Sequence, residues 1–122
     1  MYELHVVERF SAAHHLRGYG DPCEQVHGHN WKVTAFVECE HLDALGLGID
    51  FRVLRRHLRA VLADLDHRDL NETSWFRETN PSAEHLARLV FERLAERLAG
   101  GPAAVVRVLV QEGDDSGAAY RP

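Results

Sequence analysis

The sequence predicts an α+β fold in which an antiparallel four-stranded sheet carries two helices on one face. Two observations support this fold class. Stretches rich in β-branched and aromatic residues occur twice near the start of the chain and twice near its end. Between them lie two longer stretches whose apolar residues recur at helical spacing. The order ββααββ and the length of 122 residues fit a single domain over residues 1–122.

Two strands are expected in the first third of the chain. Residues 2–10 mix β-forming and polar side chains, which predicts a strand that ends near Ser11. Residues 16–26 contain glycines and an Asp-Pro pair and therefore form a loop by composition. Residues 29–39 supply the second strand of a hairpin-like pair, which places His14 just after the first strand.

Two helices follow. Asp50 is a good N-cap for a helix whose apolar positions continue to Leu65. Residues 66–80 are expected to be irregular. The second helix opens within residues 80–84 (NPSAE), with proline at an allowed first-turn position and an acidic residue that the helix dipole favours. Gly100 and the residues after it stop this helix.

The end of the chain completes the sheet and suggests assembly. Residues 104–112 are strongly apolar and predict a third strand, and residues 118–120 add a short fourth strand after a turn. A four-stranded sheet leaves two open edges, and the helices cover only one of its faces. Several chains that pair edge to edge into a closed barrel would remove those edges, so we expect an oligomer.

The composition excludes several other classes of protein. The net charge of −5 argues against a general nucleic-acid binder. No apolar run approaches the ~20 residues of a membrane span, and the charged N-terminus does not resemble a signal peptide. The two cysteines, Cys23 and Cys39, are expected to be reduced thiols. The chain is therefore expected to be cytoplasmic.

The histidines point to a metal. His27 and His29 flank Gly28, and side chains two residues apart in an extended chain leave the same face, so both rings reach one ion. A third candidate ligand lies in the upstream pair His14 and His15. Three protein ligands and an open position are what a catalytic zinc requires. His-Gly-His alone is also compatible with a turn that carries two surface histidines, but the nine histidines of the chain and the nearby cysteine favour the metal.

Four further residues are candidates for proton transfer and ligand binding. Cys23 lies four residues before His27 and is a fourth metal ligand, a nearby thiolate base or nucleophile, or a buried thiol without a role. Asp66 either orients or charges the ring of His67 for proton transfer, or the pair caps a helix. Glu112 ends an apolar strand and is either an edge residue that meets solvent or an anchor for a heterocycle with adjacent N–H donors.

Together these motifs resemble the 6-pyruvoyltetrahydropterin synthase / 6-carboxytetrahydropterin synthase family over essentially the whole chain. The spacing of the cysteine and the His-Gly-His triplet, with the upstream Ala-Ala-His, is the specific part, whereas an Asp-His pair alone is not. The residues that carry the resemblance are Phe10-Ser11-Ala12-Ala13-His14, Cys23-x-x-x-His27-Gly28-His29-Asn30, Ile49-Asp50-Phe51, Leu65-Asp66-His67, Asn80-Pro81-Ser82-Ala83-Glu84 and Glu112.

The resemblance implies a fold, a metal and a set of site residues. The implied fold is the tunnelling fold, in which trimers close a twelve-stranded barrel and two trimers stack into a homohexamer. The implied cofactor is a zinc ion. The implied site residues are His14, His27 and His29 for zinc, Cys23 together with Asp66 and His67 of a neighbouring subunit for proton transfer, and Glu112 for anchoring the pterin ring.

The resemblance also implies a substrate, 7,8-dihydroneopterin triphosphate. Carboxy-type members release triphosphate and a two-carbon fragment on the route to queuosine and related 7-deazapurines, whereas pyruvoyl-type members eliminate triphosphate with an internal redox rearrangement. The short loops favour the carboxy type. The pyruvoyl type is the alternative, and a zinc-stabilised oligomeric binding module without turnover is a third hypothesis. Neither a nucleic acid nor a membrane is expected as a partner.

Three positions depart from the family pattern. His15 follows His14 where many relatives have arginine, so either ring is a candidate ligand. Ser82 stands where threonine is common and keeps the hydroxyl, which makes it a candidate contact to the substrate. Gly113 follows Glu112 where a hydroxyl residue is frequent, which bears on a contact to the pterin.

Overall fold

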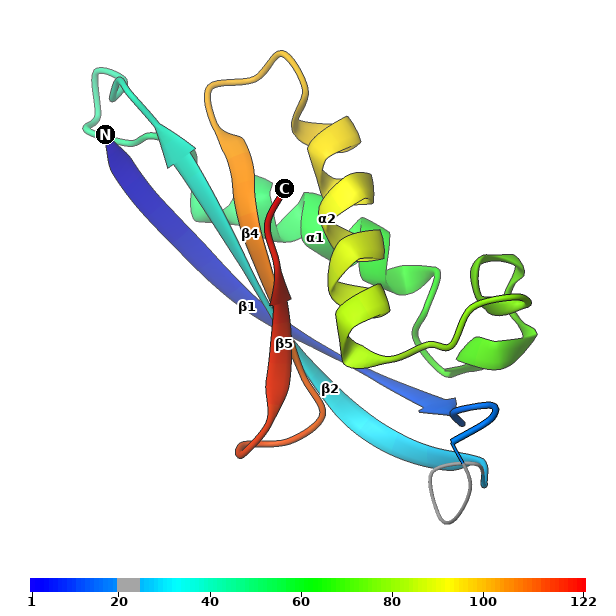
Figure 1. The fold of residues 1–122 in the computed structure, drawn as a ribbon. Helices are drawn as coiled ribbons and strands as arrows, with labels where there is room; N and C mark the ends of the chain where they lie inside the picture. The colour runs from blue at the N-terminus through cyan, green and yellow to red at the C-terminus, as the bar shows by residue number, and fades with distance from the viewer. Residues whose placement is uncertain (20–24) are drawn as a thin grey trace.

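The computed structural model describes residues 1–19 and 25–122, and its elements follow the predicted order with one short strand added (Figure 1). Two long strands begin the chain, two helices and several turns occupy its middle, and two strands end it. The elements are β1 (Tyr2–His14), β2 (His27–Cys39), α1 (Phe51–Ala63), β3 (Arg68–Asp69), the 3₁₀ turns η2 (Leu70–Glu72) and η3 (Ser74–Phe76), α2 (Ala83–Leu98), β4 (Ala104–Gln111) and β5 (Gly117–Tyr120).

The sheet has the strand order β3-β1-β2-β4-β5. β1 and β2 pair antiparallel along all 13 residues of each strand and form the long axis of the sheet. The register aligns side chains of one face into rows, because successive residues of a strand alternate between the two faces. One such row across four strands consists of Val6, Ala35, Val108 and Tyr120.

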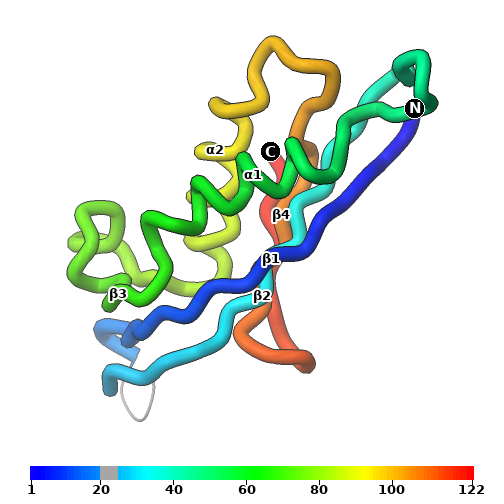
Figure 2. The backbone as a smooth tube through the Cα atoms, turned by 180° about the vertical axis from the view of Figure 1, so that it is seen from behind, coloured from blue at the N-terminus to red at the C-terminus, as the bar shows by residue number. Residues whose placement is uncertain are grey.

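Both helices pack on the face of the sheet that carries this row (Figures 1 and 2). The ring of Phe91 in α2 lies 5.2 Å from the ring of Tyr120, measured between centroids. On the α1 side, the Glu8 carboxylate of β1 accepts a hydrogen bond of 2.6 Å from Arg59. We call this side the helix-covered face and the opposite side the uncovered face. The even-numbered residues of β1 and the odd-numbered residues of β2 project on the helix-covered face.

The helix α1 begins at Asp50, the N-cap that the sequence predicts, whereas the N-cap of α2 is Ser82, which was not predicted as a cap. The Asp50 carboxylate accepts a hydrogen bond of 2.8 Å from the N–H of Arg52, and the Ser82 hydroxyl accepts one of 3.2 Å from the N–H of His85. The predicted place of the proline is wrong, because Pro81 precedes the N-cap instead of occupying the first turn. Within the described ranges, no helix is long and apolar enough to cross a membrane.

The prediction of a four-stranded antiparallel sheet is wrong, because the sheet has five strands of mixed orientation. The added strand, β3, has only two residues and runs parallel to β1. Tertiary hydrogen bonds hold it there: the N–H of His67 donates to the carbonyl of Ser11 at 2.6 Å, and the Asp66 carboxylate accepts from the N–H of Ser11 at 2.9 Å. Two residues show no periodicity in a sequence, so residues 66–80 were expected to be irregular throughout.

The two strands that carry the histidines are longer than predicted. β1 continues past Ser11 to His14, and β2 begins at His27 instead of His29. His14 is therefore the last residue of its strand, not a residue of the following loop, and it lies directly opposite His27. Regular strand pairing thus fixes the direction in which each histidine side chain leaves the backbone.

Candidate metal centre

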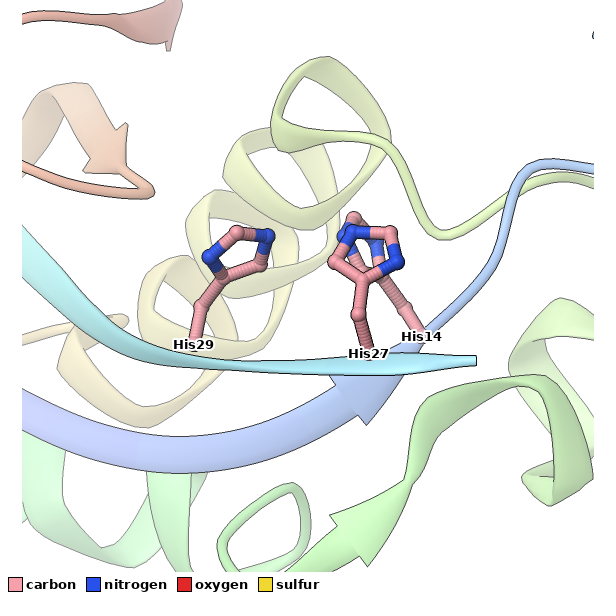
Figure 3. A group of neighbouring side chains, drawn as sticks. All are labelled: His14, His27 and His29. Carbon is pink, nitrogen blue, oxygen red and sulfur yellow. The ribbon is translucent and has the colours of Figure 1, made fainter. Parts of the chain in front are cut away.

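Three histidine side chains meet on the helix-covered face at the end of the β1–β2 pair (Figure 3). His14 lies opposite His27, and His29 follows two residues later on the same face as His27. One ring nitrogen from each residue lies within 4.8 Å of the other two. The structure thus brings together the three histidines that the sequence singles out, in a position to bind a metal ion.

Backbone carbonyls orient two of these rings. Nδ1 of His14 lies 2.7 Å from the carbonyl oxygen of Pro81, and Nδ1 of His27 lies 2.7 Å from that of Gln25. Because a carbonyl only accepts, each Nδ1 carries the hydrogen and each Nε2 keeps its lone pair. Metal-binding histidines in proteins are usually oriented by such a bond from the other ring nitrogen.

Burial keeps the His14 ring in the neutral form that binds metals. His14 is 1 % exposed, and burial is the main cause that lowers the pKa of its ring; the bond to Pro81 opposes this shift and the nearby His27 adds to it. Nε2 of His14 and Nε2 of His29 are both buried without a hydrogen-bond partner in the described part of the chain. Buried nitrogens without partners are costly, and a cation at their meeting point satisfies them. Three imidazole rings that each offer one nitrogen are a donor set that fits Zn²⁺.

The indole of Trp31 packs against two of the three histidine rings. It is fully buried, and its ring centroid lies 4.9 Å from that of His14 and 5.1 Å from that of His29, edge-on in both cases. Its Nε1–H donates to the carbonyl of Ala12 at 3.2 Å, which fixes the indole against β1. Sequence reasoning missed this residue, although its two-residue spacing from His29 places it on the same face of β2.

Glu112 reaches the centre from the end of β4. It follows Val108 and Val110 at two-residue spacing, so its side chain projects on the helix-covered face. Its Oε1 lies 3.9 Å from Nε2 of His14, and its Oε2 lies 3.7 Å from Nε2 of His29. The side chain is 37 % exposed, so the carboxylate lies between the buried nitrogens and solvent.

Asp66 and His67 are not part of the histidine cluster but lie at the edge of the sheet beside Ser11. Oδ2 of Asp66 lies 2.9 Å from Nδ1 of His67. The hydrogen bond from Ser11 is the main cause that lowers the pKa of the Asp66 carboxyl, and the contact with His67 adds to it. His67 has a φ of 58°, in the left-handed region that is uncommon for residues other than glycine and that recurs at functional sites.

His67 borders a hollow of about 500 Å³ at this end of the sheet. The hollow is also lined by Ser11, Asn30 and Arg68, and by His29 of the metal centre. The ring of His67 is 82 % exposed, so it is free to meet a ligand or another chain.

Three other predicted residues have different outcomes. His15 lies outside the cluster, with its Nε2 3.4 Å from Nδ2 of Asn71. Ser82 uses its hydroxyl as the N-cap of α2, and a contact between it and a substrate stays a prediction. Cys23 lies outside the described residues, so its role also stays a prediction.

Two asparagines that sequence reasoning did not single out hold the chain beyond His14. Oδ1 of Asn71 accepts from the N–H of His15 at 2.9 Å, and its Nδ2 donates to the His15 carbonyl at 3.0 Å. Asn80 makes the same pair of bonds with Arg17, at 2.8 and 3.1 Å. Each side-chain amide therefore bonds to both the N–H and the C=O of one residue, as the backbone of a neighbouring strand would. Their signal in the sequence is weak, because asparagine in an irregular segment usually indicates only a turn.

Comparison with known proteins identifies the family. The family model described as 6-pyruvoyl tetrahydropterin synthase matches residues 3–122. The chain belongs to the 6-pyruvoyl tetrahydropterin synthase family. The resemblance inferred from the sequence motifs is thereby confirmed.

Relatives of this chain share most of its length. The 6-carboxy-5,6,7,8-tetrahydropterin synthase of Bacillus subtilis is 30 % identical over 99 % of this chain and 86 % of its own. The dihydroneopterin monophosphate aldolase of Pyrococcus furiosus is 32 % identical over 88 % of this chain and 87 % of its own. The structure of the 6-pyruvoyl tetrahydropterin synthase of Caenorhabditis elegans matches with a TM-score of 0.86 at 25 % identity, covering 99 % of this chain and 95 % of the other. Proteins named for different reactions are thus similar to this chain over most of its length.

Proposed function

We propose that this protein is a zinc-dependent 6-carboxytetrahydropterin synthase. It converts 7,8-dihydroneopterin triphosphate to 6-carboxy-5,6,7,8-tetrahydropterin and releases acetaldehyde and triphosphate, as a cytoplasmic step toward queuosine and related 7-deazapurines. The observation that carries this proposal is the meeting of three histidine nitrogens beside the Glu112 carboxylate. The name of the Bacillus relative and the compact chain favour the carboxy-type reaction over the pyruvoyl type.

In this proposal, each residue of the centre has a separate role. The three histidines hold the zinc ion, which when bound supplies the Lewis acidity that makes C–H groups next to hydroxyl and carbonyl oxygens acidic. Glu112 accepts hydrogen bonds from adjacent N–H groups of the pterin ring and so fixes which carbon faces the centre. Cys23 acts as the thiolate base that takes the proton from that carbon. Ser82 contributes a hydroxyl contact to the substrate.

Asp66 and His67 complete the site of a neighbouring chain. An acid bonded to a histidine orients the ring for passing a proton to or from a substrate. In their own chain the two residues lie at the sheet edge, outside the cluster of the three histidines, and the His67 ring is exposed. This placement supports a homohexamer, built as a dimer of trimers, in which the pair serves the metal centre of an adjacent subunit.

Subunit mixing tests the shared site. Cys23→Ala and His67→Ala are each expected to be inactive alone, whereas mixed assemblies regain some sites that are wild type at both positions. A monomer by light scattering at micromolar concentration, or mixtures that stay inactive although the subunits exchange, would contradict the arrangement.

Product analysis after incubation with dihydroneopterin triphosphate tests the reaction itself. We expect acetaldehyde together with triphosphate. Triphosphate without acetaldehyde would identify a 6-pyruvoyltetrahydropterin synthase, and binding without any product would identify a zinc-stabilised pterin-binding module. Because the Pyrococcus relative is named for dihydroneopterin monophosphate, that compound is the matched comparison substrate. Turnover of the monophosphate alone would contradict the proposal.

A further inference from the structure

We propose that Asn71 is a positioning residue of the metal centre: it holds His14 in place through the backbone of His15 and so sets the affinity of the three histidines for zinc. This role rests on the metal binding in the proposed function, but not on the reaction with a pterin. His14 and His27 form the last pair of the β1–β2 ladder (Figure 3). The end of a strand frays readily, so the position of His14 depends on what holds the chain beyond it.

The segment 66–71 runs along the edge of β1 that faces away from β2. Ser11 directs its backbone groups to this edge: its N–H donates to the Asp66 carboxylate at 2.9 Å, and its carbonyl accepts from the N–H of His67 at 2.6 Å. The strand β3 then pairs with the next two residues of β1. Backbone groups of alternate strand residues face the same edge, so the N–H and C=O of His15 face this segment as well.

The side chain of Asn71 bonds to His15 beyond the end of β3. Its Oδ1 accepts from the N–H of His15 at 2.9 Å, and its Nδ2 donates to the His15 carbonyl at 3.0 Å. The backbone of Asn71 is held too: its N–H donates to the Asp69 carboxylate at 3.1 Å, and its carbonyl accepts from the Arg17 guanidinium at 3.3 Å. Asn71 is only 5 % exposed, so water does not readily replace these bonds.

His14 is therefore held at three points. Its backbone pairs with that of His27, Asn71 holds the next residue, and the Pro81 carbonyl 2.7 Å from Nδ1 orients its ring. Asn71 and Pro81 both lie between β3 and α2, so this part of the chain fixes the ring and the backbone that carries it. Metal ligands must be held within roughly 0.5 Å of the binding geometry. Without Asn71 the end of β1 can move, and Nε2 of His14 then moves away from the other two histidines.

The zinc affinity of matched variants tests this role. Asn71→Ala is expected to weaken zinc binding roughly ten- to a hundredfold, as the loss of a group that orients a metal ligand does. Competition with a chelating indicator measures the affinity of the full-length protein. Thr73→Val is the control, because Thr73 is 7 % exposed and its hydroxyl donates to the Leu70 carbonyl, a buried bond that involves neither His14 nor His15. It should lower the melting temperature but leave the zinc affinity unchanged.

A double-mutant cycle shows whether Asn71 acts through His14. In a His14→Ala background only two histidines remain to bind zinc, and Asn71→Ala should then cause no further loss of affinity, because the residue that Asn71 positions is gone. Asn71→Asp is a second variant for the case that Asn71→Ala does not fold. It keeps the oxygen that accepts from His15 but places another oxygen against the His15 carbonyl, so it should weaken zinc binding as well. The melting temperature of each metal-free variant shows that folded proteins are compared.

The outcomes separate the role of Asn71 from the proposed function. Equal zinc affinities of the wild type and both Asn71 variants would overturn the role. Equal losses in Asn71→Ala and Thr73→Val, or the same loss with and without His14, would overturn it too. Zinc affinity that depends on Asn71 in a protein that converts no pterin would support the role and contradict the proposed reaction, whereas pterin turnover with a zinc affinity independent of Asn71 would do the reverse. A wild type that binds no zinc would overturn both.

Discussion

Oε2 of Glu112 lies 3.7 Å from Nε2 of His29, although Glu112 directly follows β4 and His29 lies in β2, far away in the sequence. A carboxylate expected to hold the pterin ring therefore also faces a nitrogen expected to hold the metal. The negative charge of Glu112 is close enough to favour a divalent cation at the centre. Metal binding and ligand binding are thus expected to depend on the same side chain.

Glu112→Gln is expected to weaken metal binding by roughly ten- to a hundredfold, the range found when a group that supports metal ligands is removed. The substitution keeps the size of the side chain and removes the charge near His14 and His29. Competition with a chelating indicator measures the affinity. Glu96→Gln, on the exposed side of α2, is the control. An unchanged metal affinity together with weaker pterin binding would show that Glu112 acts on the ring alone.

His27→Ala and His29→Ala are each expected to lose nearly all bound metal, because each removes one of three ligands. His14→Ala should lose far more metal than His15→Ala, because only His14 belongs to the cluster. Metal analysis after gel filtration measures this content. Quenching of Trp31 by Co²⁺ in a Trp75→Phe background is a second readout, since the indole contacts two of the rings. Full zinc occupancy in the His27 or His29 variant would refute the assignment.

Cys23→Ser is expected to keep zinc content and fold while turnover falls roughly a hundredfold or more, the scale of a lost acid–base group. Serine has nearly the size of cysteine but is a far weaker acid than a thiol. Steady-state kinetics together with metal analysis distinguish the possible roles. Zinc that drops in parallel with activity would make Cys23 a metal ligand. Activity that survives would make the thiol incidental.

Asp66→Asn is expected to lower the free energy of unfolding at neutral pH. In acid the substitution should change this free energy less. The Ser11 N–H and then His67 hold the pKa of Asp66 below its ordinary value of about 3.9. A carboxyl whose pKa is lowered by folding adds stability above its unfolded pKa, and this contribution is lost as the pH falls through the folded pKa. Denaturant unfolding should show a gap between variant and wild type that is constant near neutrality and closes below about pH 4. Asp64→Asn is the control, and a gap that persists in acid would contradict this account.

Gly48→Ala is expected to destabilise the fold by about 1–3 kcal/mol, the usual cost of overpacking a core. A Cβ at this position would overlap Sγ of Cys39 and lie 3.3 Å from Cδ1 of Leu4. Cys39 is 4 % exposed and packed in the core, so it has little room to move. Gly113→Ala is the control, because a Cβ there would meet nothing within 4 Å. Equal unfolding free energies for both variants and the wild type would contradict the packing argument.

Much of the candidate metal centre was predictable because its three histidines are close together in the sequence. His27 and His29 share a face through strand alternation, and β-forming residues on both sides identified their strand. The place of Glu112 was not predictable in the same way. Its approach to the histidines depends on how β4 aligns with β2, and no pattern within either strand encodes that register.

In the fold, too, the elements that depend on nearby residues were predictable, and those that depend on contacts between distant segments were not. Both helices were predictable because their apolar residues recur at helical spacing, and for α1 also because its N-cap, Asp50, acts on a residue two positions away. The strand β3 was not, because contacts with Ser11 hold its two residues in place. The carbonyl of Pro81, which orients His14, likewise depends on the packing of a distant segment against β1.

All three histidines of the cluster lie within residues 14–29, on a single β-hairpin, whereas the Pro81 carbonyl and the Glu112 carboxylate beside them come from much later in the chain. The pairing of β1 with β2 alone is therefore enough to bring the three histidines together. An isolated two-stranded hairpin is marginally stable in water, and an ion that bridges its ends offsets part of the entropy lost when the connecting loop closes. If these histidines bind a metal ion, its supply is expected to be coupled to folding, because the bound ion would also favour the pairing of β1 with β2.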